Sequence, residues 1–168
     1  DTSGVLVLAK TPTAHQFISR QFLNRKVKKT YIGLVKGVPP VSEGTLEGKI
    51  GRHPHKRRKF TISDIGRHSL TQFQVRERFQ NTAAMLDLFP LTGRTHQIRV
   101  QLSGYQHPIL GDAIYGGKGK DFDFVPRQML HAAKIQFVYP EAQKKVTFEA
   151  PLPNDFQSVI KRLRLDKK

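Results

Sequence analysis

Consecutive strand-like segments with little helix between them limit most strongly what this chain can fold into. Alternating apolar residues bounded by turn residues predict strands at Lys29–Lys36, Thr45–Ile50, Ser69–Phe79 and Asn81–Phe89. The last two are so close in sequence that they predict a hairpin. A parallel pair would need a crossover of a dozen or so residues, so directly connected strands favour antiparallel pairing. The chain is therefore predicted to be α+β, an antiparallel or mixed sheet with flanking helices, rather than doubly wound.

Both ends of the chain add elements to this sheet. Gly4–Lys10 predicts a buried strand, and Thr11 followed by Pro12 predicts the N-cap and first residue of a helix that runs to about Arg25. Apolar residues at helical spacing predict the side of this helix that packs on the core: Ala14, Phe17, Ile18, Phe22 and Leu23. Towards the C-terminus the pattern predicts strands at Met129–Tyr139 and Lys144–Glu149, a turn at Pro140, and an amphipathic helix Asn154–Leu165 capped by Asn154.

The composition fits one compact domain and excludes several chemistries. A chain of 168 residues with 38% hydrophobic residues can bury a core without metal or disulfide support. It has no cysteine, which excludes disulfides, thiolate zinc sites and cysteine nucleophiles. The longest apolar run, Val5–Ala9, is far shorter than the roughly 20 residues of a membrane helix, and no signal segment opens the chain. We therefore expect a soluble, cytoplasmic protein with no membrane partner.

An excess of positive charge predicts a polyanionic partner. The chain has 29 Lys+Arg and 13 Asp+Glu residues, a net charge of +16. Because this charge is spread over loops and strands, nucleic acid is a better candidate than an acidic membrane, with an ordinary solvated surface as the alternative. The basic loop, Gly51–Lys59, holds the densest cluster, and we predict that it contacts phosphates through Arg52, His53, Lys56, Arg57, Arg58 and Lys59.

No motif predicts a metal or nucleotide cofactor. His53 and His55 lie close together in the basic loop, but the surrounding cations disfavour a divalent ion. The sequence contains no P-loop, no Gly-x-Gly-x-x-Gly turn and no Gly-x-Ser-x-Gly elbow. We expect neither a metal nor a cofactor.

The segment Leu91–Val100 carries the most informative pattern. A glycine turn leads into a helix that we expect to open near Thr95, so that Arg94, His96 and Gln97 share its first turn with Thr95. Backbone amides and positive charge at a helix start favour an anion or a carboxylate. Taken alone, His96 is open to three roles: a general base, a phosphate contact or a structural histidine.

Arg99 lies one turn further along this helix. Ile98 and Leu102 are expected to bury it partly, and a buried guanidinium is expected to pair with a carboxylate.

The same segment carries a resemblance to a known family. Thr92–Arg99, TGRTHQIR, resembles the third motif of the RluA-type pseudouridine synthases, which isomerise uridine in ribosomal and transfer RNA. The basic Arg52-His53-Pro54 resembles the branch that acts on large-subunit ribosomal RNA. Further matches follow in the family's order: Thr2-Ser3-Gly4 with Ala9-Lys10, Lys29-Thr30-Tyr31, His107-Pro108-Ile109-Leu110-Gly111-Asp112 with Tyr115-Gly116, and Leu130-His131-Ala132 ahead of Phe137 and Pro140.

The resemblance implies roles for individual residues. Arg99 matches the arginine that pairs with the family's essential aspartate and keeps it ionised and oriented, and Tyr31 matches the tyrosine that packs against the target base. Arg94, Thr95, His96 and Gln97 match the motif as scaffold or RNA-facing support. After Val100 the family often has histidine where this chain has Gln101, a change that we expect to affect local hydrogen bonding more than chemistry.

The essential aspartate itself is expected upstream of the chain. The family motif reads His-Arg-Leu-Asp-x-x-Thr-Ser-Gly, so Asp1, directly before Thr2, matches its second variable position and not the aspartate. We therefore interpret residues 1–168 as the C-terminal two-thirds of a catalytic domain, without its upstream strands or any S4 domain, and predict that the chain alone is inactive.

The activity implied by the resemblance is an RNA isomerisation without cofactor. The glycosidic bond of uridine breaks, the freed base rotates, and carbon-5 joins the sugar in place of nitrogen. A carboxylate would attack the sugar or remove its 2′ proton. The expected partner of this monomer is structured RNA, with ribosomal favoured over transfer RNA. The alternative is a basic RNA-binding module that holds RNA without modifying it.

Overall fold

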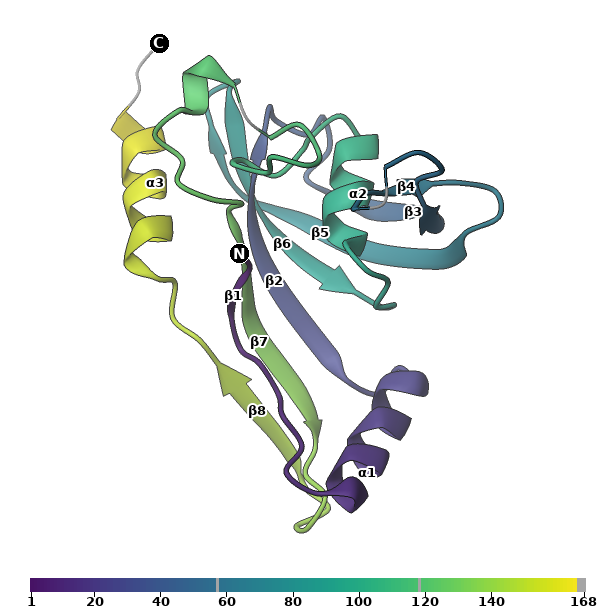
Figure 1. Cartoon of the computed structure of the whole chain (residues 1–168). Helices are drawn as coiled ribbons and strands as arrows, with labels where there is room; N and C mark the ends of the chain where they lie inside the picture. Colours follow the sequence, from purple (N-terminus) through teal and green to yellow (C-terminus); the bar gives the residue numbers. More distant parts are fainter. Residues whose placement is uncertain (57, 118, 166–168) are drawn as a thin grey trace.

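One mixed sheet organises the molecule. The computed structural model describes residues 1–56, 58–117 and 119–165. Within these residues the strands follow the order β1-β7-β2-β6-β5-β3-β4, and β8 also pairs with β7 (Figure 1). The strands are β1 Ser3–Gly4, β2 Lys28–Lys36, β3 Glu43–Arg52, β4 Phe60–Ile62, β5 Arg67–Phe79, β6 Ala83–Pro90, β7 Leu130–Val138 and β8 Lys145–Glu149. The helices are α1 Pro12–Leu23, α2 Gln97–Gly104, α3 Asn154–Leu165 and a 3-10 turn at Lys120–Phe122.

The predicted α+β class is confirmed. Among the described residues, every strand pair is antiparallel except β1 with β7, which makes the sheet mixed. The predicted hairpin is β5–β6, closed at the pair Phe79↔Ala83. The hydroxyl of Thr11 accepts a hydrogen bond from the amide of Ala14 at 3.2 Å, so the predicted N-cap of α1 is correct.

Two expectations for the N-terminal segment are wrong. The strand predicted at Gly4–Lys10 ends at Gly4, and beyond it Leu6 and Leu8 are 78% and 79% exposed. The pairing stops after one further bond from the amide of Val5 to Ala132, because β8 pairs with the same edge of β7 from Lys134 onwards.

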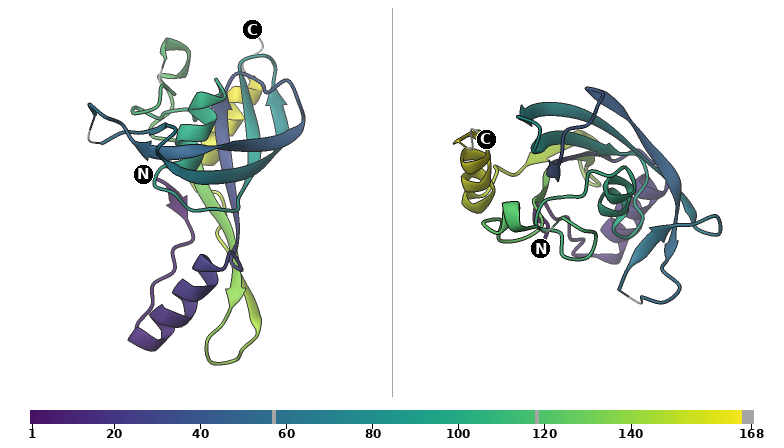
Figure 2. Two further views of the ribbon diagram at one scale, coloured as in Figure 1. Left: turned by 90° about the vertical axis from the view of Figure 1, so that its right-hand side faces the viewer. Right: turned by 90° about the horizontal axis from the view of Figure 1, so that it is seen from above.

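The apolar side of α1 is also more exposed than predicted. Phe22 and Leu23 are exposed, and the buried residue of this helix is Gln21. The Gln21 amide bonds both the N–H and the C=O of Val138 at 2.8 Å. Figure 2 shows the reason, because α1 and the β7–β8 hairpin project together from one end of the sheet, away from the other helices. These two hydrogen bonds therefore attach α1 to the C-terminal end of β7, in place of the burial of its apolar side chains that the sequence predicted.

The main core lies around the central strands. β6 is buried along most of its length, and Leu34 of β2 and Leu86 of β6 are fully buried. Leu102 of α2 and Phe156 of α3 join the same apolar cluster. α2 also contacts β3 and β4, which fixes the start of α2 near the basic loop. β3 itself continues through Arg52, so the irregular part of the basic loop is shorter than predicted.

Candidate active site

An open cleft of about 480 Å³ lies where the N-terminal segment, β2 and the start of α2 meet. Tyr31 comes from β2, and burial raises the pKa of its phenol, which keeps it protonated at neutral pH. Lys29 lines the same cleft and donates to the carbonyl of Thr92 at 3.2 Å. Burial lowers the pKa of Lys29. The cleft brings together the following predicted site residues: Tyr31, Arg94, His96, Gln97 and Arg99.

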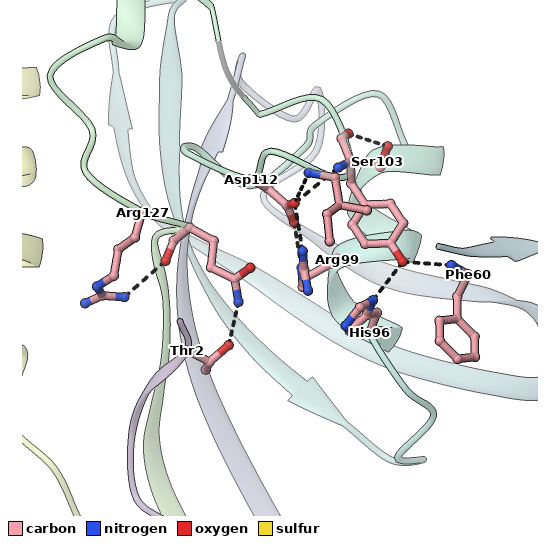
Figure 3. A network of polar contacts seen from close by, with 10 residues as sticks. Thr2, Phe60, His96, Arg99, Ser103, Asp112 and Arg127 are labelled. Atoms are coloured by element: carbon pink, nitrogen blue, oxygen red, sulfur yellow. Dashed lines mark hydrogen bonds and ion pairs between the residues drawn. The ribbon is translucent and has the colours of Figure 1, made fainter. Parts of the chain in front are cut away.

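Arg99 pairs with a buried carboxylate, that of Asp112. Its Nε and Nη2 donate to the two carboxylate oxygens at 2.7 and 2.9 Å. The amides of Ile114 and Tyr115 add hydrogen bonds to the same carboxylate (Figure 3). Burial alone would raise the pKa of Asp112, but hydrogen bonds from Arg99 and from these amides outweigh it and leave that pKa below its ordinary value. Arg99 is thus fixed in position while its Nη1 has no hydrogen bond within the described residues.

The turn before α2 is held by a buried glutamine. The Oε1 of Gln97 accepts from the Thr92 hydroxyl at 2.7 Å and from the amide of Arg94 at 2.9 Å. Its Nε2 donates to Leu70 O and to Thr71 Oγ1. The helix therefore opens at Gln97, two residues later than expected, and the roles found for Gln97 are structural.

Gln101 continues this network one turn further along α2. It is 2% exposed, accepts from the Thr71 hydroxyl at 2.6 Å, and donates to the carbonyl of Leu46 at 2.9 Å and the hydroxyl of Ser69 at 3.1 Å. These bonds connect α2 to both β3 and β5, so the floor of the cleft is tied to the sheet.

Tyr115 connects the cleft with the basic loop. Its hydroxyl lies 2.9 Å from the backbone amide of Phe60 and 2.9 Å from Nδ1 of His96 (Figure 3). Arg99 lies over the Tyr115 ring at 4.9 Å and Lys59 lies over it at 5.5 Å. Burial first, and then the charge of Arg99, lower the pKa of His96.

The N-terminal segment is held against β7 by side chains. Gln128 donates to the Thr2 hydroxyl at 2.7 Å, and the Ser3 hydroxyl lies 2.9 Å from Nδ1 of His131. Arg127 donates to the same hydroxyl at 3.2 Å and pairs with Asp155 of α3 at 2.7 Å. The residues that precede Tyr31 in the family's motif order are thereby fixed at the edge of the cleft.

The basic loop lies beside the cleft. A second hollow of about 520 Å³ is lined by Arg52, Arg67, Arg94 and Thr95 among others, so Arg94 borders both cavities. Arg52 lies over the ring of Phe60 at 5.8 Å, and Nδ1 of His53 accepts from the amides of His55 and Lys56. The other predicted contacts of the described loop line neither cavity: His53, Lys56, Arg58 and Lys59. Arg57 lies outside the described residues.

Sequence reasoning missed the partners of the predicted residues. Asp112 and Tyr115 stood in segments that match the family, but nothing local indicated that they would contact Arg99 and His96. No sequence pattern indicated that Gln128 would bind Thr2 at the edge of the cleft. In the part of the chain that the structure describes, acidic residues and histidines form no group that could hold a metal ion, and no helix is long and apolar enough to cross a membrane.

Comparisons with known proteins place this site in a family. The sequence profile described as RNA pseudouridylate synthase matches residues 1–104. An uncharacterized RNA pseudouridine synthase of Mycobacterium bovis is 42% identical over 165 residues, which cover 97% of this chain and 53% of that protein. A ribosomal large subunit pseudouridine synthase D of Xanthomonas campestris is 39% identical, with 99% and 53% covered. The chain spans about half the length of the curated relatives it matches.

A solved structure agrees with the sequence comparisons. Human RNA pseudouridylate synthase domain containing 4 superposes with a TM-score of 0.77 at 26% identity, over 97% of this chain and 72% of that one. The profile match, the relatives and the shared fold all concern the segment that builds the cleft. The chain belongs to the RNA pseudouridylate synthase family.

Proposed function

We propose that this chain forms the substrate cleft of an RNA pseudouridine synthase that acts on structured RNA, and on large-subunit ribosomal RNA in particular. The observation that carries the proposal is the state of Arg99 at the floor of the cleft. Asp112 occupies its Nε and Nη2, which fixes the guanidinium while Nη1 keeps its donors. A carboxylate entering the cleft would meet a positioned cation.

The residues of the cleft suit each requirement of this isomerisation. The family's aspartate, held ionised by Arg99, would act on the ribose while the C1′–N1 bond breaks. The uracil then turns and C5 bonds to C1′, while the proton on C5 leaves to water and N1 regains one. Tyr31 offers a neutral aromatic ring in the same cleft, against which the freed base can pack.

Positive charge beside the cleft supports RNA as the substrate. Arg52 and Arg94 line the adjoining hollow, and Lys59 lies over the ring of Tyr115, whose hydroxyl contacts His96 of the cleft. A target uridine inside folded RNA must be flipped out of its stack, which costs a few kcal/mol that phosphate contacts can offset. The name of the Xanthomonas relative supports the large ribosomal subunit as the source of this RNA. A cytoplasmic monomer completes the proposal, and light scattering of the purified protein tests its oligomeric state.

The test uses a form of the chain extended upstream through the family's His-Arg-Leu-Asp motif. We expect Arg99→Lys to slow the release of tritium from C5-labelled RNA at least about 100-fold, because a lysine cannot be held by Asp112 in the same geometry. RNA affinity should change little. Arg76→Lys is the matched control, since Arg76 makes the same two-pronged contact to an aspartate, Asp87, on the exposed surface.

Two results would contradict the proposal. Equal turnover in Arg99→Lys and the parent would show that Arg99 has no role in the reaction. RNA binding by the extended form without any tritium release would favour a binding module instead.

A further inference from the structure

The hydroxyl of Tyr115 makes two contacts, with the backbone amide of Phe60 and with the ring of His96. A backbone amide only donates, so the bond from Phe60 N at 2.9 Å makes the hydroxyl oxygen the acceptor. The hydroxyl still has its own proton to donate to its other partner, Nδ1 of His96, at 2.9 Å. Burial raises the pKa of Tyr115, so this proton stays on the phenol at neutral pH.

Donation of this proton to Nδ1 would set the tautomer of His96. A neutral imidazole carries one proton, and a ring whose Nδ1 accepts must carry that proton on Nε2. The neighbours favour the neutral ring, since Arg99 and Lys59 lie over Tyr115 and Arg52 lies over Phe60, against one carboxylate, Asp112. The direction of the His96 pKa, below its ordinary value, agrees with this balance of charge.

His96 is held in place from several sides. The rings of Phe60 and Tyr115 contact its imidazole edge-on, with centroid separations of 5.6 and 5.7 Å. Its backbone has φ of +55°, a left-handed conformation that costs a non-glycine residue about 1 kcal/mol or more. The side chain of His96 makes no capping hydrogen bond to α2, so this conformation does not stabilise the start of the helix. What the strained backbone does provide is a ring at the wall of the cleft.

The Nε2–H of this ring is available to a ligand. His96 Nε2 has no hydrogen-bond partner among the described residues. Every buried side-chain nitrogen and oxygen of these residues has a partner, so Nε2 is exposed to solvent, and His96 lines the cleft. Arg52 lies over the ring of Phe60, Lys59 lies over the ring of Tyr115, and Arg94 borders the cleft. Cations gathered in this way favour phosphate over other groups of an RNA strand.

We propose that Tyr115 is a positioning residue that presents His96 as a neutral Nε2–H donor to a phosphate oxygen of the RNA strand entering the cleft. The inference rests on the proposed function for the identity of the ligand, but the tautomer does not depend on it. Of the three roles open to His96 from the sequence, this assigns phosphate contact and excludes a general base at Nε2. Because the same hydroxyl binds Phe60 at the end of the basic loop, Tyr115 also sets the loop relative to the cleft.

The first experiment is nuclear magnetic resonance of the chain labelled with ¹⁵N in histidine. The coupling pattern of His96 should show the Nε2–H tautomer at neutral pH, and Tyr115→Phe should abolish this preference. Inorganic phosphate should shift the His96 Nε2 signal, whereas uridine without phosphate should not. An Nδ1–H ring, a doubly protonated ring, or a response to uridine alone would overturn the proposal.

The second experiment measures affinity for a transcript of large-subunit ribosomal RNA. Tyr115→Phe and His96→Leu should each weaken binding about fivefold, the loss expected for one neutral hydrogen bond. The slope of affinity against salt should not change, because a neutral donor releases no counterion. His96→Gln, which keeps an N–H near the position of Nε2, should bind like the parent. The control is Tyr105→Phe, since the Tyr105 hydroxyl makes no hydrogen bond within the described residues and its ring packs on the core.

Melting curves for each variant separate a folding defect from a binding defect. Parent-like affinity in both Tyr115→Phe and His96→Leu, or a steeper or shallower salt slope in either, would overturn the proposal. Failure of the proposed function would look different, as an absence of tritium release from the upstream-extended form with the His96 tautomer unchanged.

Discussion

Removing the carboxylate of Asp112 should cost this fold a large part of its stability. The side chain is fully buried and accepts four hydrogen bonds, two of them from Arg99. Asp112→Ala would leave the guanidinium buried without its partner, a change that costs about 3–5 kcal/mol. For a chain of 168 residues each kcal/mol corresponds to a shift of about 2–4 °C in Tm, so we expect Tm to fall by about 10 °C.

The assay is thermal unfolding followed by circular dichroism, with Asp87→Ala as the matched control. Asp87 also accepts two bonds from an arginine, but that arginine, Arg76, has a side chain 42% exposed, and we expect a loss of less than about 1 kcal/mol. Adding Arg99→Met to Asp112→Ala should restore part of the lost stability, since no unpaired charge would remain buried. Equal losses for the two aspartates, or a double variant weaker than Asp112→Ala, would refute the reasoning.

The Arg99–Asp112 ion pair also predicts how the stability of the fold changes with pH. The folded pKa of Asp112 lies below its ordinary value, so its contribution is complete above about pH 4 and is lost as the pH falls through the lower folded pKa. The stability difference between the parent and Asp112→Ala should therefore shrink on acidification and stay constant above neutrality.

Three further outcomes follow from the contacts of single residues. Gln101→Ala should lower the unfolding free energy by about 1–3 kcal/mol, measured in urea, because it leaves the Leu46 carbonyl and the Thr71 hydroxyl buried without this partner. Gly111→Ala should cost at least about 2 kcal/mol, since its Cβ would lie 1.9 Å from Arg127 O at a φ of +76°, whereas Gly116→Ala, with φ of +92° and open space around it, should cost only the left-handed backbone strain. Lys59→Ala should reduce the slope of log RNA affinity against log salt by about 1, and an unchanged slope would remove Lys59 from the phosphate contacts.

Local patterns in the sequence predicted most of the elements. The β5–β6 hairpin, the cap at Thr11 and the C-terminal helix depend on residues that are neighbours along the chain, and the structure has all three. Gly4–Lys10 failed because strand formation depends on a partner, and β7 pairs with Ser3 and Gly4 before β8 takes the same edge from Lys134 onwards. Apolar composition alone carries no information about where a partner strand stops.

For the candidate site, the sequence indicated individual residues but not the contacts that hold them. The resemblance indicated Arg99 and Tyr31, and the structure places both in one cleft. The contacts that fix them could not be predicted, because they join residues far apart in the chain. Phe60 and Tyr115 are 55 positions apart, as are Leu46 and Gln101. Side-chain hydrogen bonds of this length follow from the fold and have no local pattern.

The most direct test of the proposed activity is tritium release from RNA labelled at carbon-5 of uridine. It compares the 168-residue chain, the same chain extended upstream through His-Arg-Leu-Asp, and the extended form with that aspartate changed to asparagine. Our account predicts release from the extended form alone. Release from the asparagine variant, or from the chain without the aspartate, would contradict the assignment of the chemistry to a carboxylate held by Arg99.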